Sequence, residues 1–165
     1  MIYALDVDYR DDGSALAAAV GFSAWTDPAP AEERTVTVPS VAPYEPGAFY
    51  RRELPCLLAA LARVSGPLDG VVVDAHVWLR GEGDPGLGAR LWEALERAVP
   101  VVGVAKQAFS GGIASAVHRG GSARPLWVTA AGMELDDACA RVRAMHGAHR
   151  IPTLLKRVDA LCRGR

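Results

Sequence analysis

The sequence predicts an α/β protein in which a mixed central sheet has helices on both faces. Near the N-terminus, three apolar or alternating segments are separated by turn signals, a pattern that favours an antiparallel meander. Further along, helical patterns alternate with short apolar runs, which is typical of a βαβ half. The chain has 165 residues, of which 50% are hydrophobic. We therefore expect a single domain spanning residues 1–165.

The meander is predicted from the first three segments. Met1–Asp8 predicts a strand, and Asp11-Asp12-Gly13 is a turn signal. Ser14–Trp25 is small and apolar, and Arg34–Val41 alternates valine with threonine, so both are expected to be strands. Because Pro39 has no N–H to donate, we expect it to end the pairing of the third strand early.

The second half is predicted to alternate helices with buried strands. Gly47–Val64 places leucines at helical spacing, but Pro55 lies inside it. We therefore expect either a kink at Pro55 or a helix that starts near Arg52. The remaining expected elements are strands at Gly70–Asp74 and Val101–Ala105, a helix at Leu87–Val99, a late hairpin of Ile113–His118 and Pro125–Thr129, and helices at Leu135–Met145 and Thr153–Cys162.

Composition excludes several classes of protein. No apolar run is long enough for a membrane span, and the N-terminus lacks the basic region of a signal peptide, so we expect a cytoplasmic monomer without membrane contact. The three cysteines form no CxxC pair, which argues against a disulfide framework or a zinc site. The net charge of −1 does not indicate a dedicated nucleic-acid binder, although a basic face remains compatible with it.

Three carboxylates stand out because of their positions relative to the expected elements. Asp6 and Asp74 each end a short apolar run, and Glu53 opens a helical stretch between them. An acid at the end of a buried strand is costly unless a cation or hydrogen-bond donors compensate it. Asp159 lies at the edge of a buried helical stripe and could add a fourth carboxylate. The pattern indicates a divalent-metal site, with a capping role for Asp6 and a solvated helix face for Asp159 as the alternatives.

Five segments, in the same order and register, resemble the endonuclease V family. The loop Pro43–Gly47 followed by Arg52-Glu53 matches its PYxPG and RE pattern, and the other four are Leu5–Tyr9, Val71–Asp74, Gly103–Lys106 and Arg150–Pro152. The resemblance covers nearly the whole chain and implies a ribonuclease H-like fold. The chain departs from the family in several places. Ala75 stands where the family has a glycine after its second aspartate, and the HPR element that follows is missing. Ala131-Gly132-Met133 stands in place of the family's PGH, and Asp159 in place of the histidine of its last helix.

The resemblance implies that the protein is an endonuclease. Asp6, Glu53 and Asp74 would bind Mg²⁺ or Mn²⁺, cations that prefer hard oxygen ligands, and Asp159 would take the place of the family's histidine. Lys106 would neutralise charge on the phosphate or orient the attacking water. The expected partner is DNA or RNA, and the expected reaction is hydrolysis of a phosphodiester bond near a deaminated base such as inosine, recognised by base flipping.

The same resemblance makes the loop before the first helix a wedge that separates bases. Pro43 and Pro46 fix the backbone on either side of Tyr44, so the tyrosine can enter a base stack without a large ordering cost. Gly47 and Gly103 would line the pocket for the extruded base. The alternative is that Tyr44 is a loop aromatic that packs on the first helix.

Other residues and functions remain open from the sequence alone. His76 is expected to be either a hydrogen-bonded structural residue or a catalytic base. Trp78 is expected to be the tryptophan with the greatest exposure, because its loop is rich in glycine. Two alternative functions stand beside the first: a different metal-dependent nuclease on this scaffold, and a nucleic-acid-binding module with weak or no cleavage.

Overall fold

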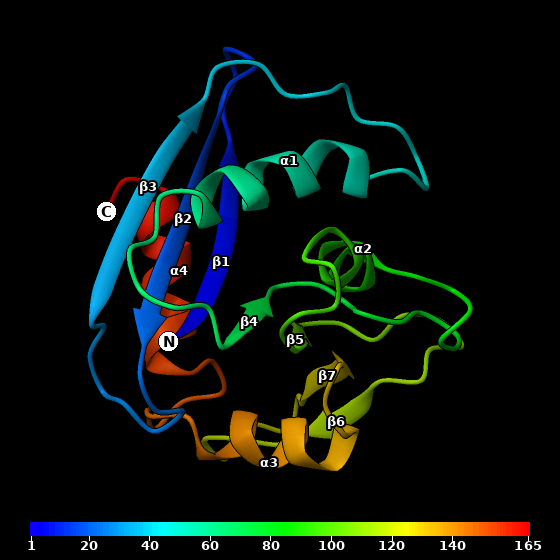
Figure 1. Ribbon diagram of the computed structural model, residues 1–165. Coiled ribbons are helices and arrows are strands. Elements are labelled where there is room, and N and C mark those ends of the chain that lie inside the picture. Colours follow the sequence, from blue (N-terminus) through cyan, green and yellow to red (C-terminus); the bar gives the residue numbers. More distant parts are fainter.

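A seven-stranded mixed sheet forms the centre of the molecule. The computed structural model describes residues 1–165, and its strands follow the spatial order β3-β2-β1-β4-β5-β7-β6 (Figure 1). The strands are β1 (Ile2–Tyr9), β2 (Ala15–Phe22), β3 (Glu32–Val38), β4 (Gly70–Val73), β5 (Val101–Ala105), β6 (Ser115–Val117) and β7 (Leu126–Ala131). β1 to β3 pair antiparallel, while β1, β4 and β5 run parallel, so the predicted meander joined to a βαβ half is confirmed.

Four helices cover the two faces of this sheet (Figure 1). The helices are α1 (Tyr50–Leu61), α2 (Leu87–Ala94), α3 (Leu135–Ala144) and α4 (Thr153–Cys162). α1 and α2 pack on one face, and α3 and α4 pack on the other. The predicted ribonuclease H-like layout, with helices on both faces, is confirmed. No helix combines the length and the apolar content that crossing a membrane requires.

The alternation of side chains along β1 decides which groups face which helices. Tyr3 and Leu5 belong to the apolar cluster under α1 and α2, whereas Ala4 belongs to the cluster under α3 and α4. Since successive side chains of a strand point to opposite faces, Asp6 follows Ala4 toward α4. β4 repeats the pattern, with Val73 under α1 and α2 and Val72 on the α4 face.

Several element boundaries differ from the sequence expectations. α2 ends at Ala94 instead of Val99, because Glu96 and Arg97 adopt left-handed backbone angles, with φ of 55° and 59°. α1 begins at Tyr50 and contains Pro55, so the expected start near Arg52 is wrong. β3 ends at Val38, immediately before the proline, and begins at Glu32, two residues earlier than expected. The late hairpin of β6 and β7 is confirmed as an antiparallel pair.

The expectation that Trp78 is well exposed is wrong. Its loop is irregular and rich in glycine, but the indole N–H donates a hydrogen bond to the carbonyl oxygen of Ala130 at 2.9 Å. The ring also packs edge-on against Trp92, with centroids 6.4 Å apart. A buried indole N–H needs an acceptor, and β7 supplies one, so the tertiary contact holds Trp78 half-buried.

Candidate active site

Two of the predicted acids meet just beyond the last residues that pair β1 with β4, although β1 itself continues to Tyr9. Leu5 of β1 pairs with Val73 of β4, and Asp6 and Asp74 are the residues that follow. Both acids line one cavity on the α4 face of the sheet. The register of two buried strands therefore brings together two carboxylates that lie far apart in the sequence.

Asp6 lies within β1, at the first position beyond the residues that pair with β4. Burial raises the pKa of its carboxyl, the backbone N–H of Val7 lowers it through a 2.9 Å hydrogen bond, and the charges of Asp74 and Asp159 raise it further, to about 6. The backbone hydrogen bond is a capping contact of the kind considered from the sequence. It does not offset the burial and the neighbouring negative charges.

Glu53 reaches the same place from the opposite face of the sheet. It lies in the first turn of α1 and is only 8% exposed. Burial, followed by the charges of Asp6 and Asp74, raises the pKa of Glu53 to about 8. No hydrogen bond to the Glu53 carboxylate offsets these effects, and only the charge of Arg52 favours the ionised form. A buried carboxylate without a partner is the strongest departure from ordinary stability rules in this molecule.

Lys106 is the cation of the cluster. It follows β5, and its ammonium donates a hydrogen bond to Asp74 at 2.7 Å. Burial lowers the pKa of Lys106, but the hydrogen bond to Asp74 and the charges of Asp74, Asp159 and Asp6 outweigh it, so the pKa is raised overall. Lys106 is therefore a fully charged group that is already engaged with one of the acids.

Asp159 lies on α4, on the other wall of the cavity that Asp6 and Asp74 line. Its carboxylate accepts a hydrogen bond from Arg163 at 3.0 Å, one helical turn further on. The buried thiol of Cys162 lies on the same helix, where burial and the charges of Asp6 and Asp159 raise its pKa to about 12. Cys162 is thus a neutral, packed thiol beneath the acids.

The donor set fits a hard divalent cation by its chemistry. Asp6, Glu53 and Asp74 supply oxygen ligands, and burial disfavours the charged forms of Asp6 and Glu53 in the absence of a cation. As the side chains stand, however, no group of three or more His, Cys, Asp or Glu residues is arranged to hold a metal ion. Lys106 compensates Asp74 in this arrangement, and the ligand set remains a prediction.

The proline-flanked loop lies beside the first turn of α1. Tyr44 is 61% exposed, the highest value among the large hydrophobic side chains noted on the surface. Its ring contacts only Phe49 among the aromatic residues, with centroids 6.3 Å apart. Gly47 has a φ of 77°, a left-handed conformation that favours glycine. Glu45 forms an ion pair with Arg51 at 3.2 Å, so its charge is neutralised within the loop.

The structure does not bring Gly103 together with this loop. Gly103 is buried within β5, where a Cβ atom would lie 2.3 Å from the carbonyl oxygen of Ala75. Its small size is therefore required for packing of β5 against the segment that follows β4. His76 is half-buried, and its Nε2 lies 3.1 Å from the carbonyl oxygen of Gln107, which favours the structural interpretation of this histidine.

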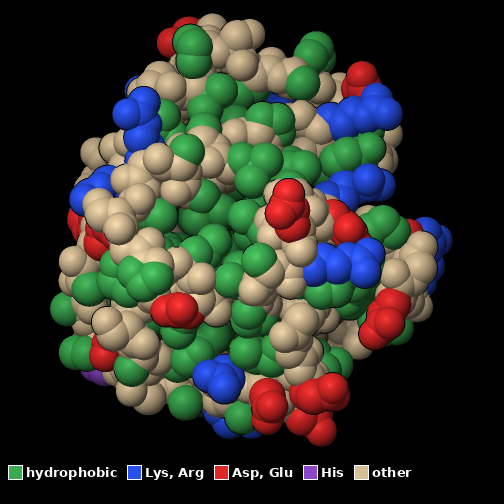
Figure 2. All heavy atoms as spheres, viewed as in Figure 1, with side chains coloured by type: hydrophobic (Ala, Val, Ile, Leu, Met, Phe, Trp, Pro, Cys, Tyr) green, Lys and Arg blue, Asp and Glu red, His purple; other side chains and the backbone are tan.

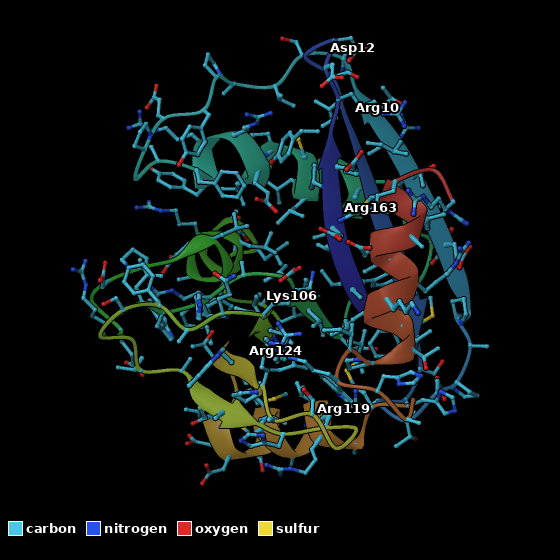
Figure 3. The ribbon with its side chains drawn as sticks, turned by 180° about the vertical axis from the view of Figure 1, so that it is seen from behind. Arg10, Asp12, Lys106, Arg119, Arg124 and Arg163 are labelled. Carbon is cyan, nitrogen blue, oxygen red and sulfur yellow. The ribbon has the colours of Figure 1, made fainter.

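Sequence reasoning missed a group of basic residues on the α4 side of the acids. Arg124, His149 and Lys156 line the same cavity as Asp6 and Asp74. Figure 3 shows Lys106 and Arg124 beside α4. The concentration of basic residues in the C-terminal third of the chain was the available signal. It did not indicate which of them would face the acids.

Comparison with known proteins identifies close relatives. The family model for endonuclease V matches residues 1–143, so α4 and Asp159 lie outside the matched part. Endonuclease V from Streptomyces avermitilis is 33% identical, over 96% of this chain and 77% of its own length. Endonuclease V from Xanthomonas oryzae pv. oryzae is 36% identical, over 76% of this chain and 52% of its own length, so the match spans about half of that relative.

Solved structures agree with the sequence matches. The crystal structure of endonuclease V from Streptomyces avermitilis has a TM-score of 0.79 and 29% identity, covering 99% of this chain and 79% of that one. Endonuclease V from Ciona intestinalis was solved in complex with a DNA containing an inosine followed by a ribo-adenosine. It has a TM-score of 0.82 and 18% identity, and the match covers 99% of this chain and 84% of that one, which shows the shared fold. The chain belongs to the endonuclease V family of metal-dependent nucleases, which hydrolyse phosphodiester bonds.

Proposed function

We propose that this protein is a Mg²⁺- or Mn²⁺-dependent endonuclease that cuts DNA or RNA near a deaminated base such as inosine. The observation that supports the proposal is the burial of Asp6 and Glu53 near Asp74: burial raises the pKa of both, the charge of Asp74 raises both further, and no hydrogen bond reaches the Glu53 carboxyl. Removal of such charges from water is costly unless a cation compensates them. The family membership supports the reaction, and the inosine-containing DNA bound to the Ciona relative supports the substrate class.

Asp6, Glu53 and Asp74 would hold the cation, with Asp159 at the edge of the site. A divalent cation at such a site activates water for attack and stabilises charge on the departing oxygen. The carboxylates come from β1, α1 and β4, so the relative position of the ligands depends on the packing of α1 against the sheet.

Lys106 would orient the phosphate. Its ammonium is more than a third exposed and pairs with Asp74, so a phosphate oxygen can replace or share that contact. In the free protein the same ion pair limits repulsion between the acids. Lys106 therefore has one role before substrate binds and another after it.

Tyr44 would separate the bases. The exposed ring is carried by a loop whose proline at each end restricts the backbone, so its insertion into a base stack costs little conformational entropy. The ion pair between Glu45 and Arg51 supports this role, because it reduces the repulsion that a free carboxylate would exert on the phosphates.

A second candidate function is nucleic-acid binding without cleavage. One observation favours it: no three acidic, histidine or cysteine side chains are positioned to hold a metal as they stand. The two candidates differ in a single measurable step, hydrolysis of the strand.

The test measures cleavage of a labelled duplex that contains one deoxyinosine. The control substrate is the same duplex with deoxyguanosine at that position, and both are incubated with Mg²⁺, Mn²⁺, Ca²⁺ or EDTA. We expect cleavage of the inosine duplex in Mg²⁺ and Mn²⁺ only. Asp74→Asn should reduce the rate by about 100-fold or more while binding in Ca²⁺ persists. Asp84→Asn is the matched control, because Asp84 pairs with Arg80 away from the acids. Binding of inosine DNA without cleavage would support the second candidate, and absence of both would contradict the proposal.

A further inference from the structure

The cavity on the α4 face extends beyond the acids and Lys106, and the proposed function uses only that end of it. Its volume is about 390 Å³, within the range of about 300–1,000 Å³ that is typical of sites for small organic ligands. We call it the α4 pocket and define it by its apolar floor and its basic rim. The floor is formed by Val72, Val104, Leu126, Leu155 and Val158, and the rim by Lys106, Arg124, His149 and Lys156.

The α4 pocket is continuous with the acid cluster. Asp6, Asp74 and Asp159 line one end of it, while Glu53 belongs to α1 on the other face of the sheet. The loop with Tyr44 also precedes α1, as Figure 1 shows. The acids therefore lie at the edge of the sheet, between the Tyr44 loop on one face and the α4 pocket on the other.

The wall of the pocket is rigidly built. The buried guanidinium of Arg119 donates hydrogen bonds to the carbonyl oxygens of Met145, Gly147 and His149, and this fixes the segment that leads into α4. Arg150, in the same segment, donates to the carbonyl oxygen of Pro125 at 2.8 Å. These contacts hold the backbone of the segment that carries His149 in place before any ligand binds.

One donor in this wall has no acceptor. The Nε of Arg150 is buried and makes no hydrogen bond, although Arg150 lines the pocket. Unpaired buried donors are rare in native proteins, because each one costs free energy. Arg150 therefore has unused hydrogen-bonding capacity within the wall of the pocket.

The chemistry of the pocket matches one nucleoside with its phosphate. The apolar floor suits the face of a base, and the positive rim suits phosphate oxygens. We propose that the α4 pocket binds one unpaired nucleoside of the cleaved strand, on the other side of the scissile phosphate from the base that Tyr44 displaces. The inference rests on the proposed function and extends it. The nucleic-acid strand would cross the end of the sheet where the acids lie, with one nucleoside held on each face of the sheet.

The experiment uses a set of deoxyinosine oligonucleotides in which one neighbouring nucleotide is replaced by an abasic analogue, at each of three positions on either side of the inosine. For the wild-type protein, we expect the abasic analogue at one position to raise KM by about tenfold, which corresponds to a loss of about 1.4 kcal/mol of base contact. Leu155→Trp fills the pocket, and for this variant KM on the intact strand should rise while the abasic penalty disappears.

Rim substitutions keep the test decisive if the tryptophan variant does not fold. Arg124→Ala and Lys156→Ala should each raise KM severalfold. Arg10→Ala removes the same charge from a site that is remote from Lys106 and Arg124 in Figure 3. This variant should leave KM unchanged. An abasic penalty that is absent at every position, or that Leu155→Trp leaves unchanged, would overturn the inference. Equal effects of Arg10→Ala and Arg124→Ala would also overturn it. A wild-type protein that does not cut inosine at all would instead refute the proposed function.

Discussion

At the scale of single residues, Glu53 occupies a position that is unfavourable for a charged side chain. It is buried, it has no hydrogen-bond donor, and Asp6 and Asp74 lie near it. A protein keeps such a group only when another state uses it, and the proposed cation-bound state is the state that would do so. The metal-free protein should therefore carry a measurable destabilisation at this position.

Glu53→Gln should stabilise the metal-free protein at pH 8 and remove its stabilisation by Mn²⁺. The folded protein raises the pKa of Glu53 to about 8, so the folded state binds this proton more tightly than the unfolded state does. The resulting penalty is absent below the unfolded pKa and develops fully as pH rises through about 8. In EDTA, the variant should melt at least about 2–4 °C higher than wild type at pH 8, with a smaller gain at pH 5. Glu45→Gln, an exposed carboxylate, is the control; equal gains in both variants would contradict the assignment.

Tyr44→Ala should weaken binding of an inosine-containing duplex in Ca²⁺ by about tenfold more than binding of the single strand, since only the duplex has a stack to open. Tyr44→Phe keeps the ring and should bind like wild type. Fluorescence anisotropy with labelled oligonucleotides measures both. Equal losses on duplex and single strand would show that the loop is not a wedge.

At the scale of elements, the contact between β1 and β3 combines burial with a charged hydrogen bond. The hydroxyl of Tyr3 donates to Glu32 at 2.6 Å, and Tyr3 itself is fully buried. The hydrogen bond from Tyr3, assisted by the contacts from Ser65 and Arg34, lowers the pKa of Glu32 to about 2. This pair links the first strand to an edge strand across β2.

Tyr3→Phe should destabilise the protein by about 1–2 kcal/mol at pH 7, because Glu32 loses its strongest donor. The pKa of Glu32 is lowered in the folded state, so this contribution is present above the unfolded pKa and is lost as pH falls through about 2. Urea unfolding should therefore show a large difference between variant and wild type at pH 7 and a small one near pH 2.5. Tyr44→Phe is the control. A difference that does not change with pH would mean that packing, not the carboxylate, carries the effect.

The segment between α3 and α4 depends on one side chain from outside it. Arg119 is 7% exposed, and carbonyl oxygens from Arg143 to Arg150 surround its guanidinium. Burial lowers its pKa. No carboxylate takes part, so the arginine acts as a multidentate donor to backbone that would otherwise lack partners.

Arg119→Lys should loosen this segment, because an ammonium cannot reach so many carbonyl groups at once. We expect a loss of about 2–3 kcal/mol in unfolding free energy and faster amide exchange for residues 145–152. Arg143→Lys, on the exposed face of α3, should change neither quantity. Unchanged exchange in Arg119→Lys would show that the segment is held by its own local contacts.

At the scale of the whole molecule, charge is balanced and dispersed. The net charge is −1, and acidic and basic side chains are interspersed over the face shown in Figure 2. Long-range attraction of nucleic acid is therefore weak, and the basic groups that matter are those next to the acids. Affinity should come from a few contacts at the edge of the sheet.

Binding of inosine duplex in Ca²⁺ should consequently depend only moderately on salt. If Lys106, Arg124 and Lys156 each neutralise one phosphate, log K should fall with log salt with a slope of about −3. The double variant Arg124→Ala, Lys156→Ala should reduce the slope by about 2. A slope steeper than about −6 would contradict binding through these few basic groups.

The sequence determined the order of the strands and helices, the mixed sheet and the family, because the spacing of apolar residues, the turn residues and the short motifs are all local properties of the chain. It also singled out Asp6 and Asp74, since each follows an apolar run, but only Asp74 follows the end of its strand, because β1 continues to Tyr9. It failed at the end of α2, where two left-handed residues stop the helix before the pattern does.

Only the tertiary structure decided which groups meet. The register of β1 with β4, the reach of Glu53 across the end of the sheet, the pairing of Lys106 with Asp74 and the basic rim of the α4 pocket all join segments that lie far apart in the chain. Burial and electrostatic coupling between distant segments depend on how the helices pack on the sheet, and no local pattern encodes that packing residue by residue.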